Sequence, residues 1–508
     1  MSFPAELVQF VLPGLFLERF KMRKRLLFFA AAALVALTGY AYWFHGPHAL
    51  QAYLAGLRAK GEKMTLGELI GSFSTNSGDC LEVLSDCVAR FGPVSCEVTN
   101  ARLVASVELT NAGALRFVQP GRAQVSFREP TPPWAGSVAG PQCSTWSGSS
   151  NRLAQVVMPL RELRNGVKHP DANGGPRSDV FRSVTPWLEV KEADAWLTFS
   201  ALVALHDGRN AEALADVEAL AGLANLHREE YSLVSEMTRV ATAEFGLDVT
   251  WQTLQATGWN DAQLAELQHS WEAVDLLGGL ERAFLGERAF GMEASSRLEA
   301  GEVPGLAKNS AGAKVYEFAL LPNDVLFRTR NLQGRVEAVR ALCANRPWQG
   351  VAKTMEKLDA EIEAKCQGPQ RYLYLLSCQS VPSYRRPVLE TVQTETKLRL
   401  AVCSIALKRY QLKHGRFPTR LEALVPAFVA SVPFDPMSGA PLGYFLNRDG
   451  TFTLYSVGED GKDDGGDASA VTSTTGSLSP AKVREWGGRD IVWPWPAGNV
   501  QQMAGTQR

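Results

Sequence analysis

Four aspartates near the C-terminal end of the chain form the pattern with the clearest chemistry. Asp460, Asp463, Asp464 and Asp467 are interleaved with glycines in the stretch GEDGKDDGGD. Carboxylate oxygens on a flexible loop suit Ca²⁺, because this ion takes several hard oxygen ligands. The loop is not an EF-hand, since Lys462 stands at the third position counted from Asp460. The pattern therefore indicates either a calcium site or a solvated acidic turn that holds no ion.

Motifs typical of enzymes are not found in the sequence. It contains no H-E-x-x-H, G-x-S-x-G, G-x-G-x-x-G or Walker sequence. The seven histidines are scattered, and an ordinary surface role is favoured for each. We therefore expect a protein without enzymatic activity and infer no small-molecule substrate. The alternative is an exported enzyme whose active site lies among the helices of the central region.

The acidic loop follows elements that the sequence marks clearly. A long amphipathic helix is expected over residues 388–413, with apolar residues along one side, basic residues elsewhere and Gly415 at the C-cap. The basic residues are Lys397, Arg399, Lys408 and Arg409. PLGYFLN and TFTLYSV are typical of strands joined by a compact turn at residues 448–450, and RDIVW, from Arg489, is a third strand. This order predicts a small α+β domain over residues 387–508, with a long helix and a short antiparallel sheet.

This stretch resembles the C-terminal domain of the major pseudopilin of type II secretion systems. The resemblance rests on a helix ending in Tyr-x-x-x-x-Gly-x-Phe-Pro, a Leu-x-x-Leu-x-Pro turn, an Asp-Pro pair, a Tyr-Ser-x-Gly-x-Asp-Gly loop and a final Asp-Ile. The matching residues are Tyr410, Gly415, Phe417, Pro418, Leu421, Leu424, Pro426, Asp435, Pro436, Gly439, Pro441, Tyr444, Tyr455, Ser456, Gly458, Asp460, Gly461, Asp490 and Ile491. The linked order of these motifs makes the match more specific than any single motif.

The resemblance implies a structural calcium ion at the acidic loop, held by carboxylates and backbone carbonyls. Carried over to this sequence, the carboxylate ligands are Asp460, one or more of Asp463, Asp464 and Asp467, and Asp490. The Val457 carbonyl is the backbone candidate. The resemblance also implies envelope or secretion proteins as partners.

The rest of the chain departs from the pseudopilin family. A pseudopilin joins a prepilin peptidase site directly to its hydrophobic helix, which runs into the terminal domain. Here residues 14–18 only echo such a site, and charged residues follow before the apolar segment. Residues 45–386 then separate that segment from the terminal domain. The layout is more similar to exported proteins of planctomycetes and verrucomicrobia that have a helical body and this terminal domain; an atypical secretion pseudopilin is a further alternative.

An apolar run over residues 26–44 predicts a membrane anchor. It carries no charge, and at about 1.5 Å per residue it reaches roughly 28 Å, enough to cross a bilayer core. The basic cluster KMRKR before it places residues 1–25 in the cytoplasm, and Tyr40, Tyr42 and Trp43 would form an aromatic belt at the far interface. We expect a single-pass protein of the bacterial inner membrane with its C-terminal bulk in the periplasm. A cleaved signal peptide, and a true start at Met22, are the alternatives.

Composition and charge fit a folded protein of several domains. The chain has 508 residues and a net charge of −1, so a nucleic-acid role has no electrostatic basis. Residues 47–147 read as a mixed membrane-proximal region that opens with a helix over residues 47–70. Residues 148–386 read as an all-helical domain. Its clearest features are a helical hairpin turning at Gly208 and a helix capped by Asn260 or Asp261.

The eight cysteines fall into an early and a late group, and none forms a C-x-x-C motif. The groups are Cys80, Cys87, Cys96 and Cys143, then Cys343, Cys366, Cys378 and Cys403. Disulfides are expected in an oxidising compartment, and four cysteines allow three connectivities. Cys403 is expected to be a buried thiol on the apolar face of its helix.

Overall fold

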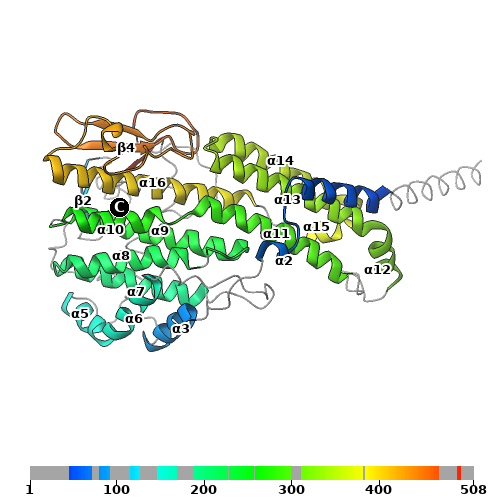
Figure 1. Ribbon diagram of the computed structural model, residues 1–508, viewed down its shortest axis with the longest axis horizontal. Helices are drawn as coiled ribbons and strands as arrows, with labels where there is room; N and C mark the ends of the chain where they lie inside the picture. The colour runs from blue at the N-terminus through cyan, green and yellow to red at the C-terminus, as the bar shows by residue number, and fades with distance from the viewer. Residues whose placement is uncertain are drawn as a thin grey trace, which may run out of the picture. The chain divides into compact units, whose positions relative to one another are not determined.

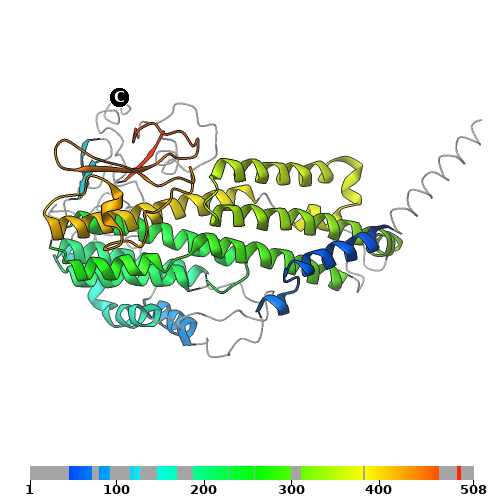
Figure 2. The same ribbon diagram turned by 45° about the horizontal axis from the view of Figure 1, so that its top comes forward.

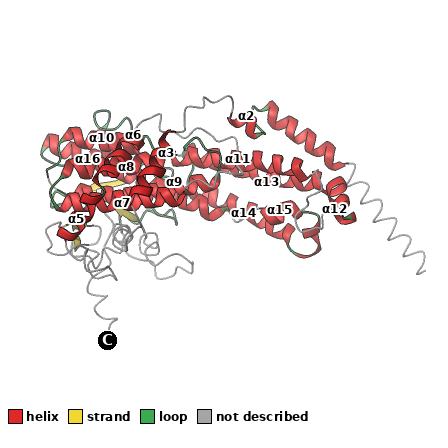
Figure 3. Cartoon of the chain, turned by 90° about the horizontal axis from the view of Figure 1, so that it is seen from below, coloured by secondary structure: helices red, strands yellow, loops and turns green. Residues whose placement is uncertain are grey.

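The computed structural model describes residues 45–70, 79–91, 115–119, 122–125, 146–168, 187–226, 228–256, 258–298, 310–380, 384–467 and 489–493. Within these ranges the chain is mostly helical, as predicted, with a two-stranded and a three-stranded antiparallel sheet (Figure 3). None of the helices described is long and apolar enough to cross a membrane. The predicted cytoplasmic segment 1–25 and anchor 26–44 lie outside the described residues.

The chain divides into two compact units. One comprises residues 1–65, 288–331 and 361–382, and the other residues 66–287, 332–360 and 383–508. Three helices contribute residues to both units, namely α11 (Leu276–Leu298), α13 (Leu321–Cys343) and α14 (Trp348–Cys366). The units do not follow the linear order of the predicted domains, because residues 383–508 group with residues 66–287.

The larger unit is built around α-helices (Figure 1). They are α2 (Leu66–Ile70), α3 (Asp79–Phe91), α5 (Trp146–Gln155), α6 (Val157–Lys168), α7 (Trp187–His206), α8 (Asn210–Asn225), α9 (Leu233–Gln255), α10 (Asp261–Glu272) and α16 (Arg385–His414). Among them, α7 packs on α8, α8 on α9, and α16 on both α9 and α10. The short strands β1 (Leu115–Gln119) and β2 (Arg122–Val125) also belong to this unit.

Two local sequence signals in this unit, a turn glycine and a helix cap, form the structures that they predicted. Gly208 has a φ of 72° in the turn between α7 and α8, which pack against each other as a hairpin. The side chain of Asn260 accepts a hydrogen bond of 2.9 Å from the backbone N–H of Gln263, and the Gln263 side chain accepts from Asn260 N–H in return. This reciprocal capping box fixes the start of α10.

The long helix α16 begins and ends close to the predicted positions, but its surroundings differ from the prediction. Gly415 closes it with a φ of 74°, which a glycine adopts without steric cost. The amphipathic pattern predicted one buried side, whereas α16 is buried on nearly all sides from Thr391 to Leu407. Its polar side packs on α9 and α10, and β4 and β5 pack on it as well. The predicted helix is confirmed, and its burial extends beyond the apolar side.

The three predicted C-terminal strands are confirmed. They are β3 (Gly443–Leu446), β4 (Phe452–Ser456) and β5 (Ile491–Trp493), in the antiparallel order β3-β4-β5. The register pairs Gly443 with Tyr455 and Ser456 with Ile491, so the central strand is β4. Figures 1 and 2 both show this sheet beside α16.

The smaller unit contains a helix over residues 45–59, followed along the chain by α12 (Ala311–Val315), the π-helical turn η2 (Tyr316–Leu320), the 3-10 turn η3 (Gly368–Tyr372) and α15 (Leu375–Ser380). The single helix predicted over residues 47–70 is thus two helices, one over residues 45–59 and the other α2. The core of the smaller unit is formed by Ala313, Tyr316, Leu321, Val325 and Leu376, against which Leu50 packs.

Candidate functional site

The acidic loop connects β4 to the segment before β5, and its described part ends at Asp467. Asp490, the residue before β5, organises this part. Its side chain is buried and accepts backbone hydrogen bonds from Gly466 at 2.6 Å and Asp464 at 3.3 Å. Its own N–H donates to the carbonyl of Asp467 at 2.9 Å. Asp490 therefore ties the start of β5 to the loop that follows β4.

The environment of Asp490 disfavours its negative charge. Burial raises the pKa of its carboxyl, the hydrogen bonds from Gly466 and Asp464 oppose this shift, and the nearby charges of Asp463 and Asp464 reinforce it. A cation beside these three carboxylates would offset the repulsion among them.

The remaining predicted ligands are engaged with protein groups. Asp463 accepts from the Tyr455 hydroxyl and from the Gly465 N–H, each at 2.9 Å. Asp467 forms an ion pair of 3.2 Å with Arg489. Asp460 accepts from the backbone N–H of Lys462 at 3.0 Å. The structure thus brings Asp463 and Asp464 close to Asp490 and joins the Asp467 carbonyl to the Asp490 N–H, while Asp460 is bonded to Lys462.

Among the residues described, no group of three or more His, Cys, Asp and Glu side chains is placed to hold a metal ion. Asp490 points both carboxylate oxygens at backbone N–H donors, one to each oxygen. Each oxygen keeps a second lone pair that could face a cation.

A second buried carboxylate, which the sequence patterns placed only in an Asp-Pro motif, joins two segments of the same domain. Asp435 is 1% exposed and accepts hydrogen bonds from Met437 N–H at 2.9 Å and Val457 N–H at 3.1 Å. The hydroxyls of Ser456 and Ser438 donate to it at 2.8 and 3.3 Å. Burial raises the pKa of Asp435, and these donors oppose the shift. The residue connects the loop before β3 to the end of β4.

Buried charges also occur between α9 and α16. Lys397 of α16 is 1% exposed, and its ammonium lies 3.2 Å from Asp248 Oδ1 and 3.3 Å from Glu244 Oε1. The hydroxyl of Thr394 donates to the other oxygen of Glu244 at 3.2 Å. Paired and hydrogen-bonded in this way, the buried lysine locks α16 onto α9.

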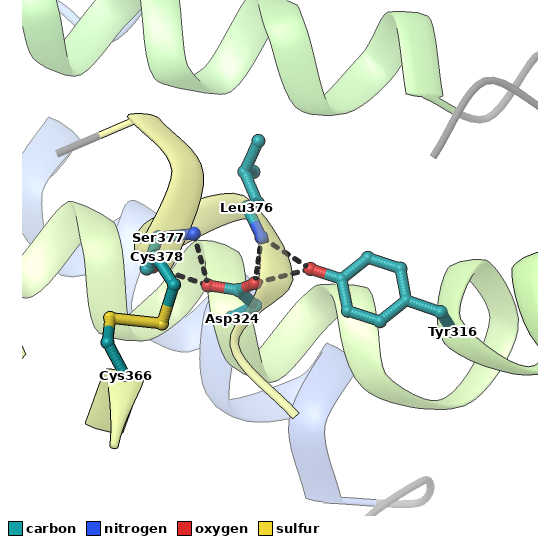
Figure 4. Close-up of a disulfide and its surroundings, with 6 residues drawn as sticks. All are labelled: Tyr316, Asp324, Cys366, Leu376, Ser377 and Cys378. Atoms are coloured by element: carbon teal, nitrogen blue, oxygen red, sulfur yellow. Dashed lines mark hydrogen bonds between the residues drawn. A yellow bond between two sulfur atoms is a disulfide. The ribbon is translucent and has the colours of Figure 1, made fainter. Parts of the chain in front are cut away.

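In the smaller unit, a buried aspartate lies beside a disulfide (Figure 4). Asp324 accepts from the N–H groups of Leu376 at 2.8 Å and Ser377 at 3.2 Å, and from the hydroxyls of Tyr316 and Ser377. Cys366 and Cys378 form the disulfide, which links the end of α14 to α15. Cys343 and Cys403 are free thiols, and Cys403 is buried as predicted. The bridge and the aspartate together fix the first turn of α15.

These clusters have a common chemical character. Each buried carboxylate is surrounded by hydrogen-bond donors or a cation of its own compact unit, an arrangement that holds loops and helices together. Sequence reasoning missed Asp324 and the Lys397 pairs, because their partners lie far away along the chain. The residues next to Lys397 and Asp324 in the sequence do not identify these partners.

No family model matches the chain, and neither a curated protein nor a solved structure matches it.

Proposed function

We propose that the chain is a single-pass protein of the bacterial inner membrane whose bulk lies in the periplasm and whose role is binding or assembly, not catalysis. Its C-terminal pseudopilin-like domain would contact envelope or secretion proteins. The observation that carries the proposal is a helix capped at Gly415, followed by a three-stranded antiparallel sheet and a glycine-rich acidic loop. This is the order of elements that the resemblance to pseudopilins implies.

The disulfide supports export from the cytoplasm. Disulfides persist in oxidising compartments such as the periplasm and are rare in the cytosol, where thiols are kept reduced. The bridge between Cys366 and Cys378 agrees with a chain whose bulk follows a membrane anchor over residues 26–44.

Exposed aromatic side chains on the C-terminal domain supply contact points for a partner. Phe445 of β3 is 41% exposed, and Phe434, in the loop before it, is 38% exposed. Aromatic side chains are enriched at protein interfaces because they bury a large area with few rotatable bonds. We assign partner binding to this part of the domain.

Calcium at the acidic loop is part of the same proposal. Its candidate ligands are Asp460, Asp463, Asp464, Asp467 and Asp490. The ion would neutralise the repulsion that Asp463 and Asp464 exert on Asp490, and so stabilise the loop. Thermal unfolding of the protein with millimolar Ca²⁺ and with chelator tests this point. An unchanged melting temperature for the C-terminal domain would reject calcium, without bearing on the anchor or the partner.

Membrane topology is the first test of the proposed function. The chain should stay in the membrane after alkaline carbonate extraction, and protease added to spheroplasts should digest the bulk of it. Release by carbonate would refute the anchor, and protection from protease would refute the periplasmic location.

Crosslinking then tests the partner. Benzoylphenylalanine in place of Phe445 should yield adducts with envelope proteins upon irradiation of cells, identified by mass spectrometry. The control is the same substitution at Tyr372 in the smaller unit, which is 55% exposed and lies outside the pseudopilin-like domain. Equal adduct patterns at both positions, or none at Phe445, would contradict binding through the C-terminal sheet.

A further inference from the structure

The described part of helix 45–59 starts at His45, the residue after the predicted anchor, so this end of the helix lies where the chain would leave the bilayer. Two contacts fix how α13 lies along this helix. A Cβ atom built on Gly46 would collide with the side-chain amide of Asn323, so the two residues touch. Further along, the guanidinium of Arg330 lies 5.1 Å from the ring centroid of Tyr53.

These contacts show that the two helices run in the same direction. The same number of residues separates Gly46 from Tyr53 as separates Asn323 from Arg330. Gly46 is therefore level with Asn323, and Tyr53 with Arg330, along the two helices. It follows that η2 and α12, which immediately precede α13, lie on the side of Asn323 where the anchor is predicted. Figures 1 and 2 show α12 beside the N-terminal end of helix 45–59.

The α12–η2 segment has two apolar sides. Ala313 and Tyr316 are buried in the core of the smaller unit, where Leu50 of helix 45–59 packs against the same cluster. On the other side, Val315 is 59% exposed and Phe318 is 67% exposed. These two residues are three positions apart and share one helix face with exposed Lys314. We call Lys314, Val315 and Phe318 the tip face.

The distance from the tip face to the predicted bilayer surface is short. Phe318, Val315 and Lys314 precede Asn323 by five, eight and nine residues, so at about 1.5 Å per residue they lie at most roughly 8, 12 and 14 Å from Asn323 along the helix. The headgroup region on each side of a bilayer core is itself roughly 5–8 Å thick. At these depths Phe318 and Val315 reach the acyl boundary, and the long side chain of Lys314 extends back to the phosphates of anionic lipids.

We infer that the tip face rests in the headgroup layer beside the anchor and is a lipid-binding surface of this protein. It gives the smaller unit a second attachment to the membrane, which restricts the rotation of this unit about the anchor helix. The inference rests on the proposed anchor, because the bilayer is placed by the end of that segment. The lipid surface is what the tip face binds in this inference. Binding of the tip face to a second copy of the chain is the alternative that the test can detect.

The test uses the full chain in vesicles of phosphatidylethanolamine and phosphatidylglycerol. Benzoylphenylalanine replaces Phe318, a conservative change at an exposed aromatic position, and lipid adducts are quantified by mass spectrometry after irradiation. The matched control carries the same group at Leu412, a 47% exposed apolar residue in the last turn of α16. We expect a several-fold higher yield of lipid adduct at position 318 than at position 412. Lys314→Glu should lower the yield at 318 on these anionic vesicles.

The outcomes separate this inference from the proposed function. If carbonate releases the chain from the vesicles, the anchor is refuted and the lipid-binding surface with it. If the chain is retained but position 318 yields no more lipid adduct than position 412, the inference alone is overturned. Adducts at 318 that join two copies of the chain also overturn it and leave the anchor intact.

Discussion

Asp435 and Ser456 are joined by a hydrogen bond of 2.8 Å from the serine hydroxyl to the aspartate Oδ1. Both residues belong to motifs of the pseudopilin resemblance, and the hydrogen bond gives those motifs a physical meaning. The carboxylate of Asp435 also accepts from the N–H of Val457, the next residue after Ser456. The Asp-Pro turn and the Tyr-Ser strand end are thus two halves of one buried polar contact.

Asp435→Ala should destabilise the C-terminal domain by about 3–4 kcal/mol, because at least two buried N–H donors lose their acceptor. Asp435→Asn retains one acceptor oxygen and should cost about 1–2 kcal/mol. Ser456→Ala removes a single hydrogen bond and should cost about 1 kcal/mol. Urea denaturation followed by tryptophan fluorescence measures the three values. A loss for the alanine variant no larger than that for Ser456→Ala would show that Asp435 does not hold the domain together.

Local signals explain what the sequence predicted correctly. The turn at Gly208, the capping box of Asn260 and the turn at Gly450 between β3 and β4 act within a few positions of the chain. Each can therefore be recognised in a short stretch of sequence. Local signals of this kind predicted the helices of the central region and the three C-terminal strands.

Contacts between distant segments explain what it did not predict. Lys397 was expected away from the apolar side of its helix, and no partner was predicted for it. Its partners Glu244 and Asp248 come from α9, so nothing near Lys397 in the sequence indicates that its side is covered. The choice of Cys366 and Cys378 among the late cysteines has the same origin, because spacing alone leaves all pairings open.

Lys397→Met should destabilise the larger unit by about 3–5 kcal/mol, because it leaves two buried carboxylates without their cation. Adding Glu244→Gln and Asp248→Asn removes the uncompensated charges and should restore most of this loss. The control is Lys353→Met at an exposed position of α14, which should change stability by less than about 0.5 kcal/mol. Chemical denaturation of the natural protein, the Lys397→Met variant, the triple variant and the control measures these differences in stability. A triple variant no more stable than Lys397→Met would rule out unpaired charge as the cause.

Asp216 of α8 predicts a pH dependence of stability. Its burial raises the pKa of the carboxyl from the usual 3.8 to about 6, although Arg164 at 2.6 Å opposes the shift. The folded protein therefore holds this proton more tightly than the unfolded chain does. The stabilisation that results is fully present below about pH 4 and is lost as the pH rises through about 6, a change of about 3 kcal/mol.

Asp216→Asn isolates this contribution from the other titrating groups. Stability of both proteins is measured by urea denaturation between pH 4 and pH 7, and the difference is plotted against pH. Relative to the variant, the natural protein should lose stability between pH 4 and pH 6 and change little above that range. A difference that is constant across the range would mean that Asp216 is ionised in the folded protein at all these pH values.

The disulfide should stabilise the smaller unit chiefly by restricting its unfolded chain. Cys366 and Cys378 are separated by 12 residues, and closing a loop of this size is worth about 3 kcal/mol in the chain-entropy model. Cys366→Ser with Cys378→Ser should lose about that amount, and hydrogen exchange should rise first at the amides of Leu376 and Ser377, which donate to Asp324. The control is Cys343→Ser, because Cys343 is an exposed free thiol and its loss should leave both readouts unchanged. If the double variant keeps full protection at those two amides, Asp324 alone secures α15 and the bridge has no part in it.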